Sequence, residues 1–173
     1  QAIIISDCFE NKMEPLSNAQ NPQCLFPVGN IPNINFVIEF LLMNQVKHII
    51  ISTKSSRDIL VKKTEQYKNQ CKLKIVSTPE AENFGDSLRS IASMDVIGQD
   101  DFIVVRGDII TNINIHEALK MHYFIKKEES KKENMDSEKS RKVSTIMTKL
   151  FLKMSYTDPL RDTNTDVTMM IDK

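Results

Sequence analysis

The sequence predicts an α/β fold in which helices flank a mainly parallel sheet. Short, Ile-rich runs without polar alternation occupy residues 2–5, 48–52 and 102–105, which is typical of strands buried on both faces. The run at 73–77 alternates, so we expect it at a sheet edge. Segments with helical periodicity separate these runs. Strands that alternate with helices form βαβ crossovers, which favour a parallel sheet.

Four helices are expected, beginning at Asn33, at Ser55 and Ser56, at Gly85 and Asp86, and at Asn114. Asn33 and Asp86 are predicted N-caps. A glutamate three residues after Asn114 resembles a capping box. The side chains expected to face the core are Phe36, Val37, Phe40, Leu41, Ile59, Leu60, Tyr67, Leu88, Ile91, Ala92, Ile115, Ala118, Leu119 and Tyr123.

The last third of the sequence is less regular. Residues 126–142 hold 12 charged side chains among 17, which indicates a charged low-complexity insertion. It is interpreted as a solvated helix extension or a disordered loop, with a docking tail as the alternative. Further strands are predicted at 143–151 and 167–171, with a loop at 155–166. We expect one domain over residues 1–173, truncated at its C-terminus as part of a longer protein.

Composition excludes several classes of protein. Lys and Arg together number 23, as do Asp and Glu, so the net charge is zero and direct binding to nucleic acid is not expected. No apolar run approaches the ~20 residues that span a bilayer, so no membrane association is expected. Cys8, Cys24 and Cys71 are odd in number and widely spaced, which argues against a disulfide framework or a zinc site. A cytoplasmic location is predicted.

The candidate site lies beyond the carboxyl ends of the strands, where parallel sheets bind ligands. Three loops leave these ends, at residues 6–23, 77–86 and 106–112. The first begins with Ser6 and Asp7, and the third contains Gly107 and Asp108.

The first loop resembles the N-terminal signature of nucleoside-triphosphate-dependent sugar-phosphate nucleotidyltransferases. The matching residues, in order and spacing, are Pro-Leu-Ser at 15–17, Pro22, Leu-Phe-Pro-Val at 25–28, and Pro32. The resemblance implies a Rossmann-like, nucleotidyltransferase (GT-A-like) fold. It also implies a base-binding segment at 79–89 and a magnesium-binding aspartate at the position of Asp108.

The residues that carry chemistry in that family are largely replaced. Cys8 and Glu10 stand where the family has phosphate-binding glycines, Gln23 replaces a lysine, and Lys12 replaces an arginine. A carboxylate facing a triphosphate is repulsive by roughly 1–4 kcal/mol per close charge pair. We therefore predict a degenerate nucleotide pocket without catalytic residues.

The other two loops support the same prediction. The segment at Gly85 and Asp86 carries Gly-Asp where active enzymes have small residues, and Asp86 is interpreted as a helix cap. Asp108 alone is weak evidence for a metal. No cofactor is expected, with magnesium at Asp108 or a bound nucleotide as the alternatives.

Three motifs narrow the resemblance. Together they are similar to the epsilon-subunit family of the guanine-nucleotide exchange factor for eukaryotic translation initiation factor 2. The three motifs are Asp-Cys-Phe at 7–9, Phe-Gly-Asp-x-x-Arg at 84–89 and Val-Arg-Gly-Asp-Ile-Ile-Thr-Asn at 105–112. The resemblance runs from about residue 2 to 123 and resumes weakly at 143–171, with the charged segment between outside it. It implies a non-catalytic assembly domain, whose partners are the gamma and other subunits and translation initiation factor 2. The exchange activity would reside in a C-terminal domain outside these residues.

Three alternatives stay open. The chain could be an active sugar-phosphate nucleotidyltransferase that uses Lys12 and Asp108 with magnesium. It could bind a nucleotide without turning it over. It could also be the paralogous gamma subunit.

Overall fold

A computed structural model describes residues 1–150 apart from 8, 10–12, 19–20, 99 and 136–146. The chain divides into two compact units, residues 1–114 and 115–173. The prediction of one domain over the whole chain stays a prediction.

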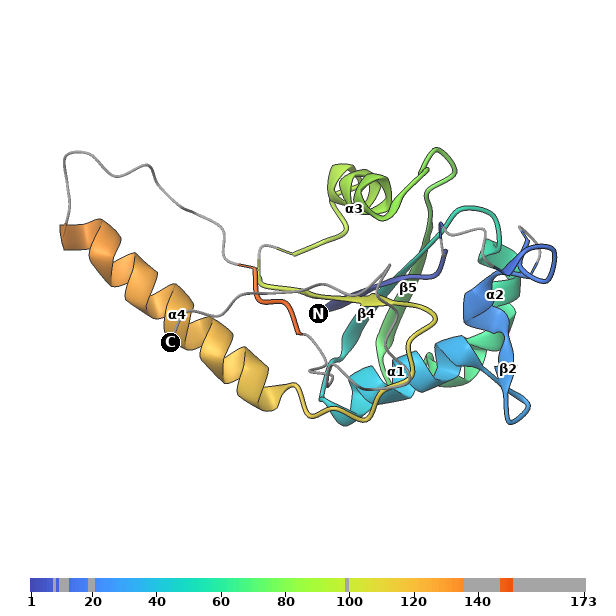
Figure 1. Ribbon diagram of the computed structural model, residues 1–173, viewed down its shortest axis with the longest axis horizontal. Coiled ribbons are helices and arrows are strands. Elements are labelled where there is room, and N and C mark those ends of the chain that lie inside the picture. The colour runs from blue at the N-terminus through green and yellow to red at the C-terminus, as the bar shows by residue number, and fades with distance from the viewer. Residues whose placement is uncertain (8, 10–12, 19–20, 99, 136–146, 151–173) are drawn as a thin grey trace, which may run out of the picture. The chain divides into compact units, whose positions relative to one another are not determined.

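The first unit is built on a four-stranded sheet (Figure 1). Its strands are β1 (Ala2–Ile5), β4 (His48–Thr53), β5 (Lys72–Ser77) and β6 (Ile103–Arg106). They lie in the order β5-β4-β1-β6, and every neighbouring pair is parallel. The α/β prediction is therefore confirmed, and β5 lies at an edge as its alternating sequence predicts.

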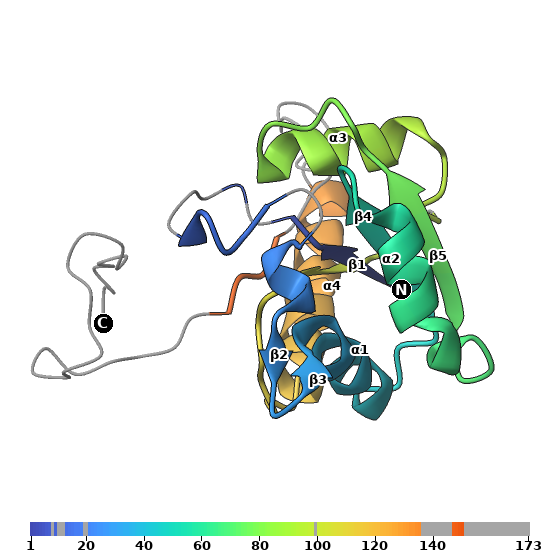
Figure 2. The same cartoon turned by 90° about the vertical axis from the view of Figure 1, so that its right-hand side faces the viewer.

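Helices cover both faces of this sheet. The first three are α1 (Asn33–Met43), α2 (Arg57–Lys63) and α3 (Phe84–Ser93). Figures 1 and 2 show α3 on one face and α1 and α2 on the other. This division follows from the strand order, because successive crossovers from β1 to β5 run in one direction and the crossover to β6 returns.

The hydrophobic core follows the two-residue period of the strands. On the α3 face, Ile3, Ile50 and Ile91 belong to one buried cluster, against which Phe9 and Leu88 pack. On the opposite face the buried strand residues are the alternate ones, which pack with the helices. Fully buried side chains of β1, β4, α1 and α2 include Ile4, Ile49, Ile51, Ile34, Val37, Ile38, Leu41 and Leu60. Burial on both faces explains why β1 and β4 are continuously apolar.

Two predicted helix caps are wrong. α1 begins at Asn33 itself, after Pro32. The Asn33 side chain does not cap the helix, because its Oδ1 accepts no hydrogen bond from the described residues, while its Nδ2 donates to the carbonyl oxygen of Asp108 at 3.1 Å. The N-cap of α3 is Asn83, whose Oδ1 accepts from the backbone N–H of Asp86 at 2.9 Å. Asn83 is extended and lies three residues earlier, so it takes the position predicted for Asp86.

Three predicted core side chains face solvent. Ile59 is 37% exposed, because α2 begins at Arg57 and buries Leu60 alone. Ala92 is exposed, and Tyr123 is 54% exposed. Tyr67 is buried as predicted, although it lies in a short 3₁₀ helix after α2.

A small hairpin precedes α1 and is absent from the sequence prediction. It consists of β2 (Pro27–Val28) and β3 (Ile31–Pro32). Gly29 and Asn30 form its turn with φ angles of +57° and +66°. Two successive positive φ angles define a type I′ turn, and glycine and asparagine are the residues that adopt them most readily.

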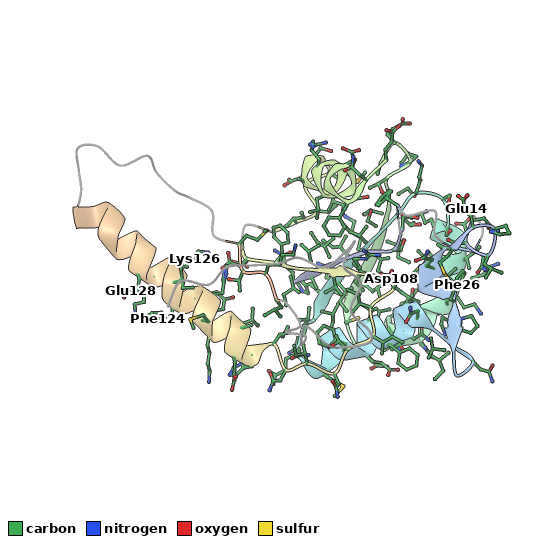
Figure 3. All side chains as sticks on the ribbon, in the orientation of Figure 1. Glu14, Phe26, Asp108, Phe124, Lys126 and Glu128 are labelled. Carbon is green, nitrogen blue, oxygen red and sulfur yellow. The ribbon has the colours of Figure 1, made fainter. Side chains whose placement is uncertain are left out.

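The second unit consists, in its described part, of α4 (His116–Met135) and residues 147–150. Figure 3 shows Phe124, Lys126 and Glu128 on α4. The helix begins two residues after Asn114 and continues to Met135. The charged segment is therefore a helix extension over 126–135, and its remainder lies outside the described residues.

The two predicted C-terminal strands have different outcomes. Residues 147–150 form no strand, so the strand predicted over 143–151 is wrong there. Instead, the hydroxyl of Thr148 lies 2.9 Å from Nδ1 of His122 on α4. The loop at 155–166 and the strand at 167–171 lie outside the described residues. No helix in the described part of the chain is long and apolar enough to cross a membrane.

Candidate functional site

The candidate site lies at the carboxyl edge of the sheet, between β1 and β6. The chain order along the sheet reverses here, because β1 has β4 on one side and β6 on the other. In open α/β sheets such a switch point creates a crevice at the strand ends. The loops after β1 and β6 both leave from this edge, as predicted.

Gly107 brings these two loops into close contact. Its N–H donates to the carbonyl oxygen of Ile5 at 2.7 Å, which extends the pairing of β1 with β6. A Cβ atom on Gly107 would lie 2.9 Å from Cα of Ser6 and 3.0 Å from Cβ of Cys24. The predicted site residue Gly107 therefore permits a close approach between backbones that no other residue allows.

Asp108 is held by an ion pair that the sequence reasoning missed. Arg106 Nε donates to Oδ1 of Asp108 at 3.1 Å, and Arg106 Nη2 donates to Oδ2 at 2.9 Å. The Asp108 side chain is only 19% exposed. Figure 3 labels its position. Gly107 and Asp108 lie in a turn after β6, so the two-residue period of a strand does not predict this pair. The closeness of the two opposite charges in the sequence was the available signal. Both carboxylate oxygens of Asp108 thus face one guanidinium.

The described surroundings of Asp108 do not fit a magnesium ion. Mg²⁺ needs oxygen ligands in near-octahedral geometry, usually including one or two carboxylates. The guanidinium of Arg106 already supplies a positive charge to both oxygens of Asp108 in a two-pronged arrangement. Among the described residues, no group of three or more His, Cys, Asp or Glu side chains could hold a metal.

Asp7 joins the ends of β1 and β4. Its Oδ2 accepts from the backbone N–H of Lys54 at 2.7 Å. Burial raises the pKa of the Asp7 carboxyl above its ordinary value, while hydrogen bonds from Lys54 and Ser6 and the Lys54 charge partly oppose this rise. Beside it, the hydroxyl of Ser6 donates to the carbonyl oxygen of Ser52 at 2.7 Å. These contacts tie neighbouring strand ends together.

Replacing Asp7 by asparagine is expected to reduce the pH dependence of stability. The folded-state pKa of Asp7 is raised above 3.8, so the folded chain binds this proton more tightly than the unfolded chain. The contribution of Asp7 to stability is therefore highest at low pH and falls as pH rises from about 4 to the raised pKa. Asp7→Asn removes this fall and still accepts the Lys54 hydrogen bond. Urea unfolding across that pH range measures the change, and a slope equal to that of the unmodified chain would contradict it.

The second loop uses its predicted site residues to start α3. Asp86 Oδ2 accepts from the N–H of Glu82 at 3.3 Å and from Nδ2 of Asn83 at 2.7 Å. Its Oδ1 accepts from Nη1 of Arg89 at 2.6 Å. Together with the Asn83 cap, this arrangement resembles a capping box, but Asp86 accepts from the N–H of Glu82 and the side chain of Asn83 and not from the backbone N–H of Asn83. Gly85 lies in the first turn of α3, between the N-cap Asn83 and Asp86. The Gly-Asp-x-x-Arg motif therefore has a local structural role.

The remaining predicted positions lie in the first loop. Gln23 is half-buried in a 3₁₀ helix beside Cys24, which is buried against Gly107. Cys8, Glu10 and Lys12 lie outside the described residues. The second loop is connected to β4 by hydroxyl groups of Ser52 and Thr78, which lie 2.9 Å apart and were also missed by sequence reasoning.

Comparison with known proteins agrees with this architecture. The sequence profile of the nucleotidyl transferase family matches residues 1–139. A Bacillus anthracis protein assigned as a glucose-1-phosphate thymidylyltransferase has a similar structure, with a TM-score of 0.61 and 20% sequence identity over 72% of this chain and 50% of that protein. At this identity, the similarity shows the fold.

Two relatives are epsilon subunits of the translation initiation factor eIF2B. The protein from Schizosaccharomyces pombe is 30% identical over 131 residues, and the protein from Dictyostelium discoideum is 27% identical over 126 residues. Each alignment covers 70% of this chain and 18% of the relative, so the chain spans less than a fifth of their length. The predicted similarity to epsilon subunits is confirmed, and with most of its length matched by the family profile, the chain belongs to the nucleotidyl transferase family.

Proposed function

We propose that the chain is the nucleotidyltransferase-like part of an epsilon subunit of the exchange factor for translation initiation factor 2. In this proposal it acts as an assembly domain in the cytoplasm and does not transfer nucleotides. Its partners are the gamma and other subunits and initiation factor 2 itself. The exchange activity belongs to a C-terminal domain outside these residues. The similarity to two epsilon subunits supports the assignment.

The ion pair between Arg106 and Asp108 is the main observation that supports a site without nucleotidyltransferase activity. Active nucleotidyltransferases bind catalytic magnesium through an aspartate at this strand end, as the family resemblance implies. Here the charge of the aspartate is matched by the guanidinium of Arg106, the last residue of β6. A divalent cation at Asp108 would lie beside that guanidinium, and the repulsion between the two positive charges would oppose binding. Without the metal, the main source of stabilisation for phosphoryl charge is absent.

The first loop supports the same conclusion on the side of the nucleotide. Gln23 has no charge to offer a phosphate, where the family has a lysine. Cys24 and the backbone of Ser6 pack closely against Gly107, so they occupy the space between the loops that follow β1 and β6. What the architecture retains is a rigid junction of strand ends, which suits a structural role.

Co-expression with the gamma subunit tests the assembly role. We expect the tagged chain to co-purify with gamma in a defined ratio. The double variant Arg106→Met, Asp108→Asn removes both charges of this ion pair together, so neither residue keeps a charge that faces a lost partner, and the variant should assemble equally well. Failure of the unmodified chain to bind gamma, although the chain melts cooperatively, would contradict the proposal. So would loss of assembly in the double variant alone.

A further inference from the structure

A shallow hollow lies at the opposite end of the sheet from the candidate site. It has a volume of about 480 Å³ and opens at the amino ends of β4 and β5. We call it the basic hollow. Its lining residues are Lys47, His48, Lys68, Asn69, Gln70, Cys71 and Lys72.

The backbone around the basic hollow is firmly held. Lys72 donates its N–H to the carbonyl oxygen of Lys47 at 2.8 Å, and His48 lies opposite Lys72 in the register of β4 with β5. The turn before β5 is anchored by Tyr67, whose carbonyl oxygen accepts from the N–H groups of Gln70 and Cys71. Tyr67 is itself buried, and its hydroxyl donates to Glu39 at 3.0 Å. The backbone positions of Lys47 and Lys72 are therefore held by the start of the β4–β5 pairing, and that of Lys68 by the turn before β5.

The charge around the basic hollow is strongly one-sided. Three of its seven lining residues are lysines, at 47, 68 and 72, although the whole chain is neutral. No acidic side chain lines the hollow. Lys68 pairs with Glu65 at 3.1 Å, but both side chains are more than half exposed, so water screens this pair.

We propose that the basic hollow binds an acidic segment of a partner protein. A concave surface lined by one sign of charge concentrates ligands of the opposite sign. Lysines are flexible point charges that suit dispersed carboxylates, and the amides of Asn69 and Gln70 can donate hydrogen bonds beside them.

RNA is the less suitable ligand for this surface. Proteins that bind single-stranded RNA stack its bases on aromatic side chains or on the guanidinium planes of arginine. The lining of the hollow contains no Arg, Phe, Tyr or Trp. The inference concerns the end of the strands away from Asp108, so it goes beyond the proposed site without nucleotidyltransferase activity and does not depend on it.

Fluorescence anisotropy with a labelled oligoglutamate peptide tests the inference on the 173-residue chain. We expect saturable binding at low ionic strength that weakens as salt is added. The double variant Lys47→Ser, Lys72→Ser should weaken binding about fivefold. The matched control, Lys62→Ser, Lys63→Ser, removes the same charge from exposed positions in the last turn of α2 and should change affinity less than about twofold.

Three results would overturn the inference. One is the absence of peptide binding by the unmodified chain. Another is equal weakening by the two double variants, which would show a response to net charge alone. The third is tighter binding of an oligouridylate of the same length, which would identify the surface as an RNA site.

Discussion

Gly107→Ala is expected to lower the free energy of unfolding by about 1–3 kcal/mol. The added Cβ would lie 2.9 Å from Cα of Ser6 and 3.2 Å from the carbonyl oxygen of Ile5. Both atoms belong to the backbone, so a change of rotamer cannot relieve the contact. The end of β6 must move away from β1, which weakens the 2.7 Å hydrogen bond from Gly107 to Ile5. Urea unfolding followed by circular dichroism measures the loss.

Gly98→Ala is the matched control for this substitution. There the added Cβ would lie 3.4 Å from Nε2 of Gln1, at the far end of a flexible side chain that can move. We expect a change below about 0.5 kcal/mol. Equal losses for the two variants would show that the contact between the β1 and β6 loops is not tightly packed at Gly107.

Leu60→Ala is expected to cost about 2–5 kcal/mol of unfolding free energy. Leu60 is fully buried, and it is the one side chain that α2 buries. Its truncation therefore removes the main hydrophobic anchor of a helix of seven residues, which is too short to persist without tertiary contacts. Chemical denaturation gives the loss, and α2 amides should also exchange hydrogen faster.

The neighbouring residue provides the control. Ile59→Ala removes a side chain of similar size that is 37% exposed, so we expect a loss of about 1 kcal/mol or less. The sequence pattern places Ile59 and Leu60 together on the inner face of the helix. Comparable losses of unfolding free energy at the two positions would show that Ile59 is as well packed as Leu60, which would contradict the structure.

β1 and β4 could be predicted because their composition reflects their burial on both faces, whereas β6 is also largely apolar but lies at the other edge of the sheet, where its residues are half-buried. β1 reads Ala-Ile-Ile-Ile, and only a strand covered on both faces tolerates such a run. The edge position of β5 could be predicted for the converse reason, since its Lys72 and Lys74 alternate with Leu73 and Ile75.

Helix starts and inner faces were harder to predict, because several residues compete locally for the same role. Asn83 and Asp86 are both good caps, and the backbone conformation of Asn83 decides between them. Asn33 is a good cap by type, but a contact with Asp108, 75 residues away, uses its side chain instead. Such long-range contacts cannot be recognised from the neighbouring residues in the sequence.

The candidate site shows the same limit. The position of Asp108 could be predicted from the end of a strand, because parallel strands place their ligand loops there. Its pairing with Arg106 depends on the direction of both side chains around Gly107, which the sequence does not state. The hydroxyl contact between Ser52 and Thr78 likewise depends on the register of neighbouring strands.

The central claim is that Asp108 is neutralised by Arg106 and does not hold a metal–nucleotide complex. Calorimetric titration of the folded 173-residue chain with GTP and excess magnesium tests it most directly. We predict no saturable heat, either for the unmodified chain or for Asp108→Asn. Saturable one-site binding by the unmodified chain that Asp108→Asn abolishes would contradict the claim.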